Sequence, residues 1–119
     1  MIIAFTLDGE DINGAVDPRF GRAKKFLLYD TEQKKTQIVD NRQVLDAAQG
    51  AGIQAAQNLI NHKVKALITG NIGPKAFKVL SAAGIKVYQS HQTAVKEALD
   101  SYLQGKLTEF SDANVEGHW

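Results

Sequence analysis

One stretch of the sequence decides the fold: VKALITGNIGPKAFKVLSAAGIKVYQ, residues 64–89. The apolar run 64–69 predicts a buried strand, and the Gly/Pro-rich loop 70–74 ends it. Apolar residues at helical spacing then predict a helix from Pro74 to near Gly84, followed by a strand over 85–89. A strand, a helix and a second strand in this order predict two parallel strands joined by a right-handed crossover.

The rest of the chain extends this unit on both sides. Apolar runs predict strands over 2–7, 25–30 and 36–40, and the last two form a hairpin. Helical spacing predicts helices over 51–62 and from Ser90 or Gln92 to about residue 104. The chain order β-β-β-α-β-α-β-α predicts an α/β fold with a mixed five-stranded sheet, in which an antiparallel meander adjoins the parallel strands.

Composition narrows the function classes. The chain has 119 residues, 44% of them hydrophobic and 23% charged, which is ordinary for a folded domain. Because cysteine is absent, disulfides, thiolate metal sites, cysteine nucleophiles and cysteine-held iron–sulfur clusters are excluded. A net charge of +1 does not indicate nucleic-acid or membrane binding. No apolar run reaches membrane-spanning length, so we expect a cytoplasmic protein. We also expect the protein to be a monomer.

Charge is distributed unevenly along the chain. Residues 1–108 carry a net charge of +4, whereas residues 109–119 carry three acids and no base. The end of the chain also lacks apolar periodicity. We therefore expect an α/β domain over 1–108 and a flexible acidic tail over 109–119.

Glycine-rich loops are predicted to share one edge of the sheet. Ligands of such sheets bind beyond the carboxyl ends of the parallel strands. If the first strand is parallel to strand 64–69, loops 8–24, 41–52, 70–74 and 89–92 meet there and form a rim. Seven of the ten glycines lie in these loops: Gly9, Gly14, Gly21, Gly50, Gly52, Gly70 and Gly73. They indicate a shallow site lined by main-chain N–H groups, although glycines also mark ordinary loops.

Positive charge near this rim favours an anionic ligand. Two predicted helices begin at the rim, at Gly50–Gly52 and at Gly73–Pro74, and helix N-termini attract anions. Arg19, Arg22, Lys24 and Lys25 add charge nearby, although a solvated basic face is the alternative. The glycine spacing matches neither the dinucleotide nor the P-loop fingerprint.

The most distinctive segment is VDPRFGRA, residues 16–23, in which Phe20 either walls a site or plugs the core. With this segment the chain resembles the nitrogenase iron–molybdenum cofactor biosynthesis accessory family, especially its small orange-protein-like members. The matching positions are 16–23, Phe26, Asp30, Asn41, 50–52, Ala55, Ala56, 66–73, Ala76, Leu80, Gly84, Ile85 and 103–107.

The resemblance implies a ribonuclease H-like three-layer fold and a non-enzymatic role. The implied role is to bind or carry an anionic metal–sulfur cluster, held non-covalently at the Gly-rich rim. The cluster would be a molybdenum–copper sulfide or an iron–molybdenum cofactor precursor. The resemblance also implies a P-loop ATPase of the chromosome-partitioning type as a partner.

The chain departs from the nitrogenase-linked members at Arg19, where they commonly carry a histidine, often with a cysteine shortly after. Arginine stays protonated and is not an ordinary metal ligand, but it can pair with an anion. The departure favours a cluster that brings its own sulfides. The expected cluster-binding residues are Arg19, Phe20, Gly21, Arg22, Gly50, Gly52, Gly70, Asn71, Gly73 and His91, with His91 as the one metal contact.

Other interpretations stay open. The chain could be a metal-free interaction or regulatory module that partners a P-loop ATPase, or it could bind a small organic anion or nucleotide at the helix N-termini. We expect His62 to serve a helix end and His118 to lie in the tail. Nuclease and serine-hydrolase chemistry are disfavoured, because the sequence shows neither converging carboxylates nor a GxSxG elbow.

Overall fold

The computed structural model describes residues 1–41, 51–91 and 93–113. All predicted strands and helices are present in the predicted chain order. Two short strands and a 3₁₀ helix occur in addition. The elements are β1 (Ile2–Asp8), β2 (Ala15–Val16), η1 (Phe20–Arg22), β3 (Lys25–Asp30), β4 (Lys35–Asp40), α2 (Ala51–Asn61), β5 (Val64–Thr69), α3 (Pro74–Ala82), β6 (Lys86–Gln89), α4 (Val95–Leu103) and β7 (Thr108–Glu109).

The sheet has seven strands rather than the predicted five. Its order is β4-β3-β1-β5-β6-β7, and β2 pairs with β1. The antiparallel meander of β1, β3 and β4 is confirmed, as is the parallel alignment of β1, β5 and β6. The prediction missed β2 and β7 because a two-residue strand is too short to show an alternating pattern.

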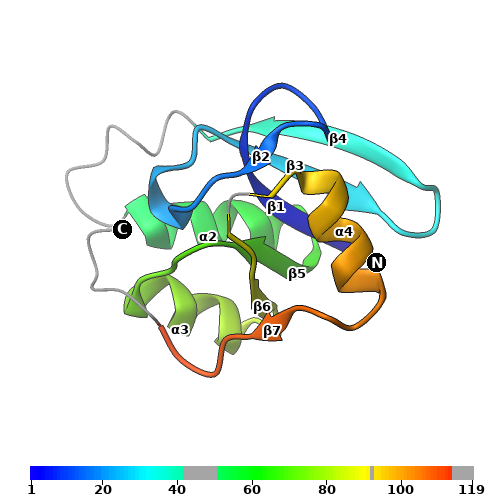
Figure 1. Ribbon diagram of the computed structural model, residues 1–119. Coiled ribbons are helices and arrows are strands. Elements are labelled where there is room, and N and C mark those ends of the chain that lie inside the picture. The colour runs from blue at the N-terminus through cyan, green and yellow to red at the C-terminus, as the bar shows by residue number, and fades with distance from the viewer. Residues whose placement is uncertain (42–50, 92, 114–119) are drawn as a thin grey trace.

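Two hydrophobic cores hold the helices against opposite faces of the sheet. Ala55, Leu59 and Leu80 of α2 and α3 pack on one face, and Val95 and Leu99 of α4 pack on the other. Figure 1 shows this arrangement, with α2 and α3 on one side of the strands and α4 on the other. The predicted three layers are thus present. Of the described helices, none is long and apolar enough to cross a membrane.

The first residues of the predicted tail belong to the sheet. Thr108 and Glu109 pair with Gln89 and Tyr88, and the Phe110 N–H donates to the Val87 carbonyl at 2.8 Å. The Phe110 ring also packs against the core beneath α2 and α3. The boundary expected at residue 108 is therefore wrong, because it divides β7. Residues 114–119, which include His118, lie outside the described residues.

This packing predicts that Phe110→Ala destabilises the domain. Because the ring is only partly buried, we expect a loss of about 1 kcal/mol in the free energy of unfolding, or roughly 4 °C in Tm. Thermal unfolding followed by circular dichroism measures the effect. Leu103→Ala is the control, since Leu103 is 58% exposed and should cost little. An unchanged Tm for Phe110→Ala would show that the segment after β7 does not support the core.

Candidate functional site

Two of the loops predicted to form the rim, residues 8–24 and 70–74, meet at the carboxyl ends of β1 and β5. Arg19 and Asn71 form an isolated parallel β-bridge between the loops. The Phe20 N–H donates to the Asn71 carbonyl at 3.2 Å, and Asn71 Nδ2 donates to the Pro18 carbonyl at 2.8 Å. The segment that carries Arg19 is thus fixed to the Gly70–Gly73 loop. Asn71 acts within the rim as a brace, a role that the sequence did not suggest.

Buried hydroxyl groups support this junction from below. Thr6 on β1 and Thr69 on β5 are fully buried, and their Oγ1 atoms lie 3.0 Å apart. Thr6 Oγ1 donates to the Asp17 carbonyl at 2.7 Å, and the Asp17 N–H donates to the Thr6 carbonyl at 2.8 Å. Sequence analysis missed both threonines. The available signal was a hydroxyl residue near the carboxyl end of each apolar strand.

The absence of a side chain at Gly70 lets the loop that contains Pro18 lie close to the Gly70–Gly73 loop. A Cβ placed on Gly70 would lie 2.8 Å from Pro18 Cα and 3.1 Å from the Pro18 carbonyl oxygen. Both are backbone atoms, so a side chain at this position would push the loops apart. The approach of Pro18 thus explains glycine at this position, and the predicted approach of a ligand to the Gly70 backbone stays a prediction.

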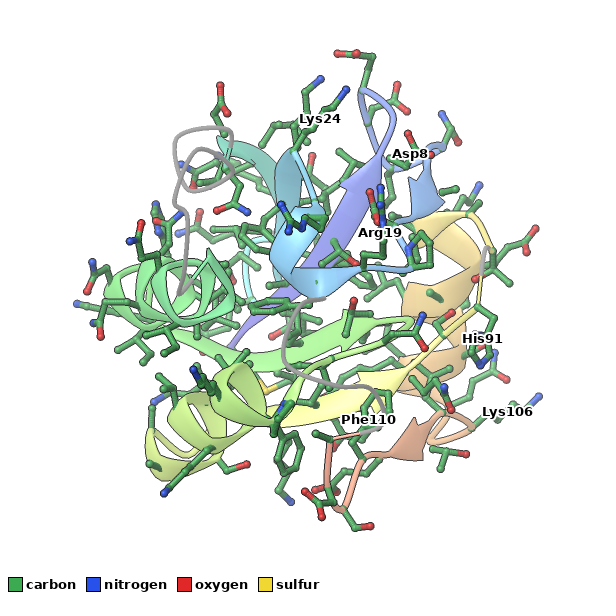
Figure 2. All side chains as sticks on the ribbon, turned by 90° about the vertical axis from the view of Figure 1, so that its left-hand side faces the viewer. Asp8, Arg19, Lys24, His91, Lys106 and Phe110 are labelled. Atoms are coloured by element: carbon green, nitrogen blue, oxygen red, sulfur yellow. The ribbon has the colours of Figure 1, made fainter. Side chains whose placement is uncertain are left out.

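Three cationic side chains stand out from the rim. Arg19, Arg22 and Lys24 are exposed, and among the described residues none of them has an ion-pair partner. Lys25 differs, because its Nζ lies 2.9 Å from Glu10 Oε2 and its charge is already paired. Figure 2 shows Arg19 and Lys24 in the upper half of the molecule, together with the exposed carboxylate Asp8. The rim therefore carries three cations without an ion-pair partner among the described residues, beside the carboxylates of Asp8 and of Asp17, whose Oδ1 accepts the Arg19 backbone N–H at 2.9 Å.

Phe20 does not line the rim. Its side chain is 0% exposed, and its ring centroid lies 5.7 Å from that of Phe26 within the core. Gly21 is buried as well. The interpretation of Phe20 as an apolar wall is therefore wrong, and its alternative as a core plug is correct. The burial anchors η1, so that Arg19 and Arg22 on either side of Phe20 project outward.

Gly52 and Gly73 have structural places at the starts of two helices. A Cβ on Gly52 would lie 3.2 Å from the Ala76 methyl group, so Gly52 permits α2 and α3 to pack closely. Gly73 is the N-cap of α3, with an extended backbone at φ −83° and ψ 167°. Its carbonyl accepts the Phe77 N–H at 3.1 Å. Gly50 lies outside the described residues.

His91 lies apart from the Arg19 loop. The exposed imidazole lines a hollow of about 320 Å³ between the end of β6, α4 and the approach to β7. Its described lining includes Glu97, Ser101 and Lys106, and no residue of loops 17–22 or 70–73. Figure 2 shows His91 and Lys106 together at the lower right, below Arg19. The predicted contact of His91 with the same ligand as Arg19 therefore lacks support from this geometry.

The first residues of α4 and α3 offer few free N–H groups to an anion. At the start of α4, the Val95 N–H donates to the Gly14 carbonyl at 2.8 Å and the Lys96 N–H donates to the Ile12 carbonyl at 3.0 Å. Helix α3 begins with Pro74, which has no N–H to offer. The N–H groups at these three positions are therefore used or absent, whereas the start of α2 at Ala51 adjoins residues outside the described part of the chain, so the predicted anion site there stays a prediction.

Side chains that commonly bind metal ions do not gather in the described residues. No group of three or more His, Asp or Glu side chains there could hold an ion. His62 Nδ1 lies 2.8 Å from the Asn58 carbonyl at the end of α2, as a helix-end role predicts. Among the described residues, the rim can therefore offer a ligand cationic side chains and main-chain groups.

Comparison with known proteins agrees with the pattern carried by residues 16–23 and 66–73. The model of the family described as dinitrogenase iron–molybdenum cofactor matches residues 1–105. The chain belongs to this family. The match covers every element from β1 to α4 and both loops of the rim.

Relatives of this family member are similar along nearly their whole length. An uncharacterized protein of Methanocaldococcus jannaschii is 35% identical over 113 residues, which are 92% of each chain. The apo form of the orange protein from Desulfovibrio gigas is 41% identical, with a TM-score of 0.92 over 96% of each chain. A NifB-like protein from Thermotoga is 37% identical, with a TM-score of 0.84 over 98% of each chain. The mixed α/β fold is thus that of the orange protein.

Proposed function

We propose that this protein binds an anionic metal–sulfur cluster as a non-covalent cargo at the rim. The cluster is a molybdenum–copper sulfide or a precursor of the iron–molybdenum cofactor. The protein acts as a carrier rather than a catalyst. Arg19, Arg22 and Lys24 neutralise the cluster, and the braced loops 17–22 and 70–73 hold these cations in place.

The observation that carries the proposal is positive charge that no described residue pairs, on loops braced by hydrogen bonds to one another, in a chain without cysteine. Without cysteine, the protein cannot supply thiolate ligands to bare metal ions. A thiometallate brings its own sulfides and a net negative charge. It therefore needs cationic side chains, and the rim has three of them. Membership of the cofactor family and likeness to the orange protein support the same cargo class.

Anaerobic reconstitution with tetrathiomolybdate and copper(I) tests the proposal. We expect a coloured protein that retains molybdenum and copper in a fixed ratio after gel filtration. The visible spectrum reports the cluster, and elemental analysis reports the ratio. Reconstitution with molybdate, which lacks sulfide, is the matched control and should leave no bound metal.

A folded protein that stays colourless and metal-free in both reactions would contradict the proposal. That outcome would favour the other function, a metal-free module whose exposed cations contact an acidic surface of a P-loop ATPase. A protein that retains copper but no molybdenum after gel filtration would have a copper site and would not be a thiometallate carrier.

A further inference from the structure

Asn41 forms hydrogen bonds with the carboxyl end of the segment that carries Arg19, Arg22 and Lys24. It follows β4 directly and is 1% exposed. Its backbone N–H donates to the Lys24 carbonyl at 2.8 Å, and its side-chain Nδ2 donates to the Ala23 carbonyl at 2.9 Å. One buried residue therefore holds two successive carbonyls immediately after η1.

The 3₁₀ turn η1 needs this support. Its own main-chain hydrogen bonds are long, at 3.3 Å from the Arg22 N–H to the Arg19 carbonyl and 3.5 Å from the Ala23 N–H to the Phe20 carbonyl. A single turn of 3₁₀ helix has poor hydrogen-bond geometry and little intrinsic stability. The direction in which Arg22 and Lys24 leave the rim thus depends on contacts from outside the turn.

The unpaired oxygen of Asn41 shows which part of the side chain matters. Oδ1 is buried, and among the described residues no donor forms a hydrogen bond with it. A buried acceptor without a donor opposes folding, so an apolar side chain of similar size would suit a purely packing role better. The amide at this position is therefore explained by its Nδ2 donor, and the unpaired oxygen accompanies it.

We propose that Asn41 is a positioning residue for anion binding, an inference that rests on the function proposed above. The segment from Pro18 to Lys24 is held at both ends by side-chain amides. Asn71 Nδ2 donates to the Pro18 carbonyl at its start, and Asn41 Nδ2 donates to the Ala23 carbonyl near its end. Asn41 sets the geometry of Arg22 and Lys24 without touching the cargo, and it lowers the ordering cost of binding by preorganisation.

Replacement of Asn41 by leucine tests this role through binding. We expect Asn41→Leu to weaken tetrathiomolybdate binding by about tenfold, because the cations are no longer preorganised. The dependence of affinity on salt concentration should stay that of the wild type, since the number of cations is unchanged. Asn41→Ala, which lacks the donor and adds no charge, is the second variant in case the leucine variant fails to fold. Asn61→Leu is the control, because Asn61 is exposed on α2 and its side chain accepts the Gln57 amide at 3.1 Å, its one side-chain hydrogen bond among the described residues.

Amide hydrogen exchange supplies a readout that does not depend on the cargo. We expect faster exchange at the Arg22 and Ala23 N–H groups in both Asn41 variants, and wild-type rates on β1 and β5. Wild-type affinity in a folded Asn41→Leu variant would overturn the proposal, as would unchanged exchange at Arg22 and Ala23. If the wild-type protein itself binds no thiometallate, the proposed function fails, and the exchange rates alone decide whether Asn41 holds the segment.

Discussion

Replacement of Arg19 by glutamate is expected to lower thiometallate affinity by at least about thirtyfold and leave the fold intact. Reversal of one charge about 4 Å from an anionic cargo changes the interaction by about 2 kcal/mol even at the dielectric constant of water. The Arg19 side chain is exposed, and its bridge to Asn71 runs through the main chain, which the substitution retains. Metal retained after gel filtration and a spectroscopic titration measure the loss.

Lys65→Glu is the matched control for this charge reversal. Lys65 is exposed near the amino end of β5, at the edge of the sheet opposite the rim. The same change in net charge there should lower affinity only slightly, because exposed charges far from the cargo are screened. Equal losses in the two variants would mean that net charge, not the rim, attracts the anion. Full uptake by Arg19→Glu would place the cargo elsewhere.

Replacement of Gly70 by valine is expected to damage both stability and binding. The new Cβ would lie 2.8 Å from Pro18 Cα, so the loop over residues 17–22 must move away from the Gly70–Gly73 loop. Forced overpacking of this kind costs about 1–3 kcal/mol, and loss of the hydrogen bonds to Asn71 adds to the cost. Denaturant unfolding measures the stability, and tetrathiomolybdate titration at a temperature where the variant is folded measures the binding.

Gly52→Ala provides the comparison for Gly70→Val. Among the described residues, its Cβ would meet only the Ala76 methyl group, at 3.2 Å, and alanine is favoured over glycine within a helix by about 1 kcal/mol. We expect unfolding free energy close to that of the wild type, and unchanged binding. A Gly70→Val variant with wild-type binding would show that contact between the two loops is not required for the site.

Much of the candidate site depends on contacts between residues that are distant in the sequence. Arg19 and Arg22 are exposed, which agrees both with anion binding and with a solvated basic face, so their role stays a prediction. The role of Phe20 stayed open until its contact with Phe26 was known. Lys25 was counted with the free cations, although Glu10, fifteen residues away in the chain, pairs with it. Pairing of this kind is decided by distance in space, which charge counts along a sequence do not contain.

The amino-acid sequence by itself determined the main strands and helices, their order and the family, because these depend on local apolar spacing and on motifs within one or two loops. Tertiary structure alone decided the rest. It brought Thr6, Thr69 and Asn71 under the Arg19 segment, paired β7 with β6, and placed His91 in a hollow that no described residue of loops 17–22 or 70–73 lines. The physical reason is that hydrogen bonds and close contacts between β1, β5 and their loops join residues more than fifty positions apart. No periodicity in the chain records such contacts.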